Sequence, residues 1–192
     1  MENKKTASKQ SIKKIALCGV MIALGTVLSM FKVYEPPLGG GVTVMSMVPV
    51  AFISCVLGLK WGFGAAFAYS LSQLMLSFGE VMSWGLSAGA VVATLILDYI
   101  LAYTVLFVCG AFRKKGAIGI VAGVALGTFL RFVCHFLTGV YIFDIWLPEE
   151  WDNVWIYSLC YNGGYMLPEL VVTEIVLAAL IATKAYKKII KA

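Results

Sequence analysis

Apolar residues gather in six runs along the chain, separated by short polar or charged segments. A membrane-crossing helix needs about 20 mostly apolar residues, and in lipid a single short segment can satisfy its backbone hydrogen bonds only as a helix. The pattern therefore predicts an all-α integral membrane protein, in which residues 1–192 form a single membrane domain of six transmembrane helices. The predicted spans are residues 12–31, 42–59, 61–78, 86–112, 117–140 and 154–182.

The segments outside the spans predict where the chain meets water. Residues 1–11 are polar and basic, and no small-residue cleavage pattern ends the first apolar run, so they are interpreted as a cytoplasmic tail rather than a secretory signal. Residues 32–42 contain two prolines and three glycines and cannot form a regular helix. This external loop is either a lid over a membrane pocket or a simple reversal of the chain.

The charged residues test the number and orientation of the spans. With the exception of Glu2 and Lys32, basic residues fall on one side of the predicted membrane and acidic residues on the other. By the positive-inside rule, both termini are predicted to be cytoplasmic and the acidic loops external. The net charge of +5 is accordingly interpreted as an orientation signal beside anionic lipid, with no role in binding nucleic acid. The basic positions are Lys4, Lys5, Lys9, Lys13, Lys14, Lys60, Arg113, Lys114, Lys115, Lys184, Lys187, Lys188 and Lys191, and the acidic positions are Glu35, Glu80, Asp144, Glu149, Glu150 and Asp152.

The composition agrees with a membrane protein. Hydrophobic residues make up 61% of the chain and charged residues 13%, against roughly half and a quarter in soluble domains. No GxxxxGK[ST] phosphate loop occurs, so ATP that drives any transport must be hydrolysed on another chain. The five cysteines are isolated and the chain has one histidine, a pattern that predicts neither a metal site nor a cofactor.

Polar residues within the spans form the candidate site, because ionisable groups in lipid mark function more often than packing. Asp98 and Arg131 lie on predicted helices of opposite direction, each about 21 Å from the cytoplasmic end, so they can meet. His135 lies one turn farther out, on the same face as Arg131. Tyr157 and Asn162 enter from the external side at the start of the last span. These residues are therefore expected to converge in the outer half of the bundle.

Each of these residues also has a purely structural interpretation. Asp98 and Arg131 could form a buried ion pair that binds no ligand. His135 could be a hydrogen-bonded core residue, and Asn162 could cap the start of a helix. Tyr157 and Asn162 diverge by about 140° on a regular helix, so lining one pocket together requires an irregular first turn.

The residue types predict what such a pocket binds. A carboxylate flanked by aromatic rings in a low dielectric favours a cation, and Trp84 supplies a ring just before the fourth predicted span. Amide, hydroxyl and imidazole groups add directed hydrogen bonds suited to a heteroaromatic ring. The predicted ligand is therefore a small, flat, positively charged solute. A small intramembrane enzyme with His135 as base, aided by Tyr157 or Ser158, is the competing hypothesis, although no nucleophile and base stand at catalytic spacing.

Five segments of the chain resemble a known family. In chain order they are GGGVTVMSMVPVAFI, LKWGFGAAFAYSLSQL, LDYILAY, LGTFLRFVCHFLTGVYIF and VWIYSLCYNGGYMLP. They are similar to the thiamine-specific substrate-binding membrane subunit, called the S component, of bacterial energy-coupling factor (ECF) transporters. The last two segments are specific, because an arginine, a histidine and a Tyr-Ser-Leu-x-x-Asn pattern in these relative places are not dictated by hydropathy.

The resemblance implies a six-helix bundle in the bacterial cell membrane that captures thiamine from outside and has no catalytic activity. It also implies docking on a transmembrane coupling subunit that carries two ATP-binding cassette ATPases. An S component for a thiamine precursor or a related cationic heterocycle stays open as an alternative.

The family's thiamine contacts, carried over residue by residue, fall on eight positions of this chain. Asp98 takes the role of counter-charge, and it is one methylene shorter than the Glu of some members. Trp84 and Tyr99 take the role of ring contacts, and the family's ring contact in the third span falls on Gln73. Hydrogen-bond partners fall on His135, Tyr157 and Asn162. The full predicted set is Gln73, Trp84, Asp98, Tyr99, His135, Phe143, Tyr157 and Asn162.

Overall fold

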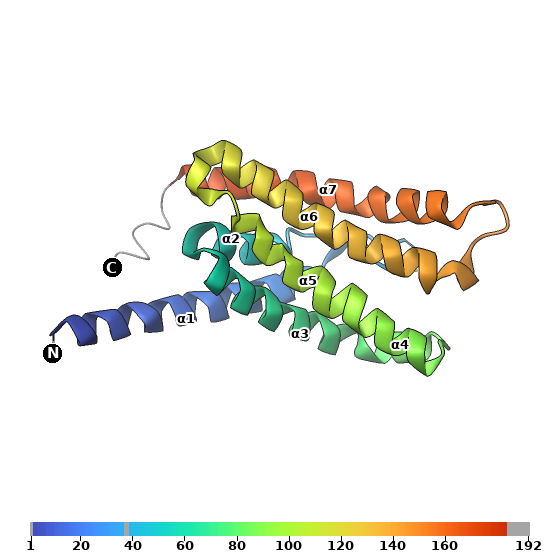
Figure 1. Cartoon of the computed structure of the whole chain (residues 1–192), viewed down its shortest axis with the longest axis horizontal. Helices are drawn as coiled ribbons and strands as arrows, with labels where there is room; N and C mark the ends of the chain where they lie inside the picture. Colours follow the sequence, from blue (N-terminus) through green and yellow to red (C-terminus); the bar gives the residue numbers. More distant parts are fainter. Residues whose placement is uncertain (1, 37–38, 184–192) are drawn as a thin grey trace.

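The structure is a computed structural model that describes residues 2–36 and 39–183. It is an elongated helical bundle in which α6 and α7 lie side by side, with α1 and α3 on the other side of a central rod (Figure 1). The central rod corresponds to the fourth predicted span and is called the fourth rod below. It consists of α4, a π-helical stretch (Leu95–Leu101), α5 and a 3₁₀ stretch (Val105–Gly110). The helices are α1 (Glu2–Ser29), α2 (Val48–Leu57), α3 (Leu59–Ser83), α4 (Ala88–Thr94), α5 (Ala102–Thr104), α6 (Gly116–Tyr141) and α7 (Val154–Ala182), and the strands are β1 (Lys32–Tyr34) and β2 (Val42–Thr43).

The predicted span 42–59 is wrong at its start. The helix α2 begins only at Val48, and the residues before it form β2, which pairs antiparallel with β1. Met45 has a φ of 61°, in the left-handed region, so a right-handed helix cannot run through it. Pro49 stands in the first turn of α2, where a missing N–H costs nothing. The prediction that each span is helical along its whole length therefore fails here.

Three stretches of the described chain are long and apolar enough to cross a membrane: Gln10–Ser29, Ala88–Tyr141 and Val154–Ala182. The second contains both the fourth rod and α6, which run in opposite directions (Figure 1). The helix α2 is apolar but has only 10 residues, and α3 has 25 residues of lower average hydrophobicity. The arrangement is typical of a helical membrane protein.

The main hydrophobic core lies around α2, which packs against α1, α3, the fourth rod and α7. With 10 residues, α2 is much shorter than α3, α6 and α7. The buried core residues are Met47, Val50, Ala51, Phe52, Cys55, Ala66, Tyr69, Leu106, Cys109, Val124 and Leu177.

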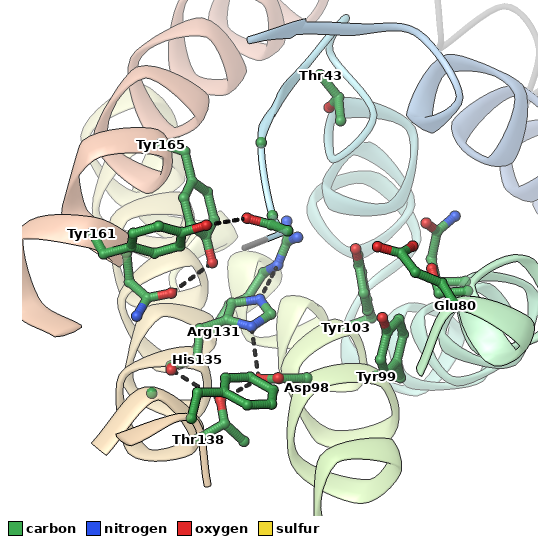
Figure 2. Close-up of a pocket in the computed structure, with 18 of the residues that line it drawn as sticks. Thr43, Glu80, Asp98, Tyr99, Tyr103, Arg131, His135, Thr138, Tyr161 and Tyr165 are labelled. Carbon is green, nitrogen blue, oxygen red and sulfur yellow. Dashed lines mark hydrogen bonds and ion pairs between the residues drawn. The ribbon is translucent and has the colours of Figure 1, made fainter. Parts of the chain in front are cut away.

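A stripe of glycines on α6 brings this helix close to the fourth rod. A Cβ atom built at Gly123 would lie 2.2 Å from the backbone oxygen of Cys109, closer than any side chain allows. Small residues four positions apart let two helices approach closely in lipid. The same face continues in steps of four to Arg131 and His135, which therefore point toward the rod that carries Asp98 (Figure 2).

Candidate functional site

A cavity of about 350 Å³ lies between α3, the fourth rod, α6 and α7, with the β1–β2 hairpin along one side (Figure 2). All eight residues predicted for the site line this cavity. They come from four separate helical segments and from the turns after α3 and α6, so the fold brings together positions far apart in sequence. Their contact with a ligand stays a prediction. They are Gln73, Trp84, Asp98, Tyr99, His135, Phe143, Tyr157 and Asn162.

Asp98 lies in the middle of the π-helical stretch of the fourth rod. Such stretches are rare within α-helices and occur frequently at functional sites. The residue is only 8% exposed, and its Oδ1 atom accepts a hydrogen bond from the hydroxyl of Thr138 and lies 2.9 Å from Nδ1 of His135. No other described residue forms a hydrogen bond with its second oxygen, Oδ2. A buried carboxylate therefore borders the cavity with one oxygen available to a ligand.

Arg131 and His135 are one turn apart on α6, and Nε of Arg131 donates a hydrogen bond to Nε2 of His135 at 3.3 Å (Figure 2). The guanidinium of Arg131 also lies over the ring of Tyr103, 4.3 Å from its centroid. The alternative interpretation of Asp98 and Arg131 as a direct buried ion pair is wrong. Among the described residues the carboxylate pairs with His135, which lies between the two. Both imidazole nitrogens are thus engaged within the protein.

The helix α7 begins at Val154, and the side chain of the preceding residue, Asn153, caps its first turn. Asn162 lies well inside this helix, so the interpretation of Asn162 as a cap is wrong. Tyr157 and Asn162 both line the cavity although α7 is regular from Val154 onward. The predicted irregular first turn is therefore also wrong, because the cavity borders two neighbouring faces of the helix.

Neighbouring side chains fix the orientation of Asn162. Its Nδ2 atom donates to the backbone oxygen of Ser158 at 3.0 Å and to the Ser158 hydroxyl at 3.1 Å. Its Oδ1 atom accepts from the hydroxyl of Tyr165 at 2.7 Å. An amide oxygen can accept two hydrogen bonds, so Asn162 keeps one acceptor position for a ligand.

Aromatic rings form the end of the cavity next to the connection between α3 and α4. The ring of Trp84 meets that of Phe143 edge to face at 5.6 Å and that of Trp146 at 6.0 Å. Phe143 and Trp146 stack on each other at 5.4 Å. The three rings hold one another in place, and two of them, Trp84 and Phe143, line the cavity, where aromatic rings suit a cation.

The wall opposite α7 comes from α3 and the fourth rod. Gln73 donates from Nε2 to the hydroxyl of Ser29 at 3.0 Å and so ties α3 to α1. Tyr99 and Tyr103 lie on successive turns of the rod and face the cavity together with Glu80 (Figure 2). Sequence reasoning missed Glu80 as a site residue, because its position near the end of a predicted span made it an orientation marker.

The β1–β2 hairpin contacts α7 along the cavity. The hydroxyl of Tyr161 donates to the backbone oxygen of Gly39 at 2.8 Å. Farther along, the carboxylate of Glu169 accepts hydrogen bonds from the backbone N–H and the hydroxyl of Thr43. The hairpin is therefore held against the bundle at two points, on the same helix that carries Tyr157 and Asn162.

Several residues that shape the site were not predicted from the sequence. Tyr161 and Tyr165 follow Tyr157 at intervals of four, which is the spacing of one helix face, so this signal was present. Thr138 follows His135 by three positions and shares its face in the same way. Within the described residues, no group of three or more His, Cys, Asp or Glu side chains is placed to hold a metal ion.

The chain matches one known family along most of its length. The family described as "Thiamine transporter protein (Thia_YuaJ)" matches residues 15–189. The chain belongs to the thiamine transporter family. Members of the thiamine transporter family are membrane proteins and not enzymes, so the hypothesis of an intramembrane enzyme is set aside. The resemblance noted from the five sequence segments is confirmed.

Individual members of the thiamine transporter family are also similar. Thiamine transporter ThiT of Bacillus subtilis (strain 168) is 31% identical over 190 residues, which cover 92% of this chain and 93% of that protein. Thiamine transporter ThiT of Lacticaseibacillus paracasei is 30% identical over 149 residues, or 70% of each chain. The solved structure of ThiT from Listeria monocytogenes has a TM-score of 0.75, covers 95% of this chain and 98% of its own, and is 20% identical. That likeness shows a shared fold.

Proposed function

We propose that this chain is the thiamine-binding S component of a bacterial ECF transporter. It captures thiamine outside the cell and delivers it through a transmembrane coupling subunit driven by two ATP-binding cassette ATPases. The observation that carries the proposal is the Asp98 carboxylate, buried beside a cavity lined with aromatic rings, in a chain of the thiamine transporter family. The absence of a phosphate loop from the sequence fits a subunit whose ATPases are separate chains.

The chemistry of thiamine suits this cavity. Thiamine joins a cationic thiazolium ring to an aminopyrimidine, and a volume of about 350 Å³ lies within the range of sites for small molecules. The unpaired oxygen of Asp98 supplies the counter-charge, and the rings of Trp84 and Phe143 offer their faces to the cation. Tyr157 and Asn162 supply hydrogen bonds to the pyrimidine, with the acceptor on Asn162 suited to its amino group.

For His135 we propose a role through Asp98 in place of the direct hydrogen bond to the ligand that was predicted from the family. With one ring nitrogen bonded to Arg131 and the other beside Asp98, the imidazole holds the carboxylate in place. A ligand that took either nitrogen would have to break one of these contacts. His135 therefore acts in binding mainly through Asp98.

We further propose six spans with both termini cytoplasmic and the cavity opening to the outside. In support, the basic turn Arg113–Lys115 lies at the same end of the bundle as the N-terminus, and the connection between α6 and α7 lies at the opposite end (Figure 1). The lysines from Lys184 onward, which contributed to this prediction, lie outside the described residues. The lid proposed for residues 32–42 corresponds to the hairpin, and its residues 37–38 are also outside the described part.

Calorimetric titration of the purified chain in detergent with thiamine tests the proposal. We expect the wild-type protein to bind thiamine and Asp98→Asn to bind about a hundredfold more weakly, because the ligand's buried positive charge would lose its partner. Glu174→Gln, which removes a carboxylate of α7 away from the cavity, is the matched control. Unchanged binding by Asp98→Asn would refute its role. Tighter binding of a pyrimidine or thiazole precursor than of thiamine would favour the alternative ligand class.

A further inference from the structure

Arg131 is a buried cation without a direct carboxylate partner among the described ion pairs. It is only 7% exposed, and it forms a hydrogen bond from Nε to His135 and a cation–π contact with Tyr103. A buried charge that is not paired directly is costly, so its place in the fold calls for a function. The arginine side chain has only donors and keeps its proton in proteins. The atom that receives its N–H, Nε2 of His135, must therefore be an unprotonated acceptor.

This contact determines where the imidazole carries its proton. A neutral imidazole has one donor nitrogen and one acceptor nitrogen. With Nε2 as the acceptor, the proton lies on Nδ1, which is 2.9 Å from Oδ1 of Asp98. A doubly protonated His135 would direct an N–H at the N–H of Arg131 and lose this hydrogen bond.

We propose that Arg131 is a positioning residue that holds His135 in the neutral Nδ1–H tautomer, so that the imidazole donates to Asp98 and leaves the other carboxylate oxygen to the ligand. Oδ1 of Asp98 then accepts from both His135 and Thr138. Two donors on one oxygen stabilise the ionised carboxylate and fix its plane. Oδ2 is left to meet a cation in the cavity.

The other groups around His135 do not compete for Nε2. The ring of Tyr165 meets the imidazole at 6.2 Å, and its hydroxyl donates instead to Oδ1 of Asn162. Tyr103 contacts the guanidinium through its ring face and so helps to hold Arg131 in place. Among the described hydrogen bonds, Arg131 alone donates to Nε2.

The chain offers a direct test because His135 is its only histidine. Labelling with ¹⁵N-histidine therefore gives one imidazole, whose two nitrogen shifts report which nitrogen carries the proton. Spectra of the ligand-free protein in detergent at neutral pH are expected to show a protonated Nδ1 and an unprotonated Nε2. A protonated Nε2 in the wild-type protein, in either the neutral or the charged ring, would overturn the proposal. This outcome is independent of thiamine binding.

Two variants separate the hydrogen bond of Arg131 from its charge. In Arg131→Gln the amide nitrogen occupies the same place along the side chain as Nε, so a donor is kept without the charge. Arg131→Met has a methyl group there and keeps neither. We expect the Nδ1–H tautomer to persist in Arg131→Gln and to mix with the Nε2–H form in Arg131→Met. A wild-type spectrum from Arg131→Met would overturn the proposal, and the wild-type measurement alone decides it if Arg131→Met does not fold.

The consequence for the ligand depends on the proposed thiamine function. We expect Arg131→Met to weaken thiamine binding about tenfold more than Arg131→Gln does, because a carboxylate hydrogen bond is lost. If the two variants bind thiamine equally while their tautomers differ, the positioning role in binding is refuted. If the wild-type protein shows the expected tautomer but binds no thiamine, the proposed function fails and the assignment of the tautomer stands.

Discussion

Glu169, in the middle of α7, accepts hydrogen bonds from both the backbone N–H and the hydroxyl of Thr43, the last residue of β2. The two residues are 126 positions apart in sequence, and Glu169 is only 2% exposed. Its second oxygen, Oε2, has no hydrogen-bond partner among the described residues. Because a buried carboxylate is costly unless it is paired, this contact holds the hairpin in place beside the cavity.

We expect Glu169→Gln to loosen the hairpin and to speed thiamine dissociation. The amide replaces charge-assisted hydrogen bonds with weaker neutral ones, a loss of about 1.4 kcal/mol, which corresponds to a roughly tenfold faster dissociation. Stopped-flow measurement of tryptophan fluorescence, with Trp84 on the cavity wall, reports the rate. Glu174→Gln is the control on the same helix. Equal dissociation rates for Glu169→Gln and the wild-type protein would show that the contact does not hold the bound state.

The hydropathy of the sequence predicted the long helices of the fold but not the hairpin before α2. The predicted span 154–182 coincides with α7, because the length and composition of an apolar run determine a helix in lipid. The start of α2 was missed. The hairpin before it depends on Glu169 and on a left-handed Met45, neither of which appears in the apolar pattern.

The candidate site, like the fold, could be predicted from the sequence only in part. The depth of each residue along its helix predicted that Asp98, Arg131 and His135 lie close together. In the structure Arg131 contacts His135, and His135 contacts Asp98. The alternative of a direct ion pair between Asp98 and Arg131 was wrong, because the rotation of each helix decides which side chain lies between the other two. The π-helical stretch around Asp98 changes that rotation, and no residue type in it signals a π-helix.

Thr138→Val is expected to weaken thiamine binding about tenfold. The substitution keeps the shape of the side chain but removes the hydroxyl that donates to Asp98, a bond to a charged group that is typically worth about 1.5 kcal/mol. Thr128→Val is the matched control on α6, because the buried hydroxyl of Thr128 has no hydrogen-bond partner among the described residues. Calorimetry should show near wild-type affinity for the control. Equal losses in both variants would exclude a specific role for Thr138.

Gly123→Ala is expected to destabilise the fold by about 2 kcal/mol, because the added methyl group would overlap the backbone of the fourth rod. Gly163→Ala, on α7, is the control, since a Cβ atom there would have no neighbour within 4 Å. The control should be stabilised by roughly 0.5–1 kcal/mol, the usual gain for alanine over glycine in a helix. Thermal unfolding in detergent measures both. Similar melting temperatures for the two variants would contradict close contact between α6 and the rod.

Trp84→Ala is expected to weaken thiamine binding about tenfold, whereas Trp84→Phe should keep most of the affinity. A ring over a desolvated cation contributes about 1–2 kcal/mol, and phenylalanine preserves a smaller ring that still packs against Phe143. Trp155→Ala is the control, because Trp155 is 48% exposed and does not line the cavity. Calorimetric titration of the three variants gives the comparison. If Trp84→Ala binds as tightly as Trp155→Ala, Trp84 makes no contact with the cation, and the recognition of charge falls to Asp98 and Phe143.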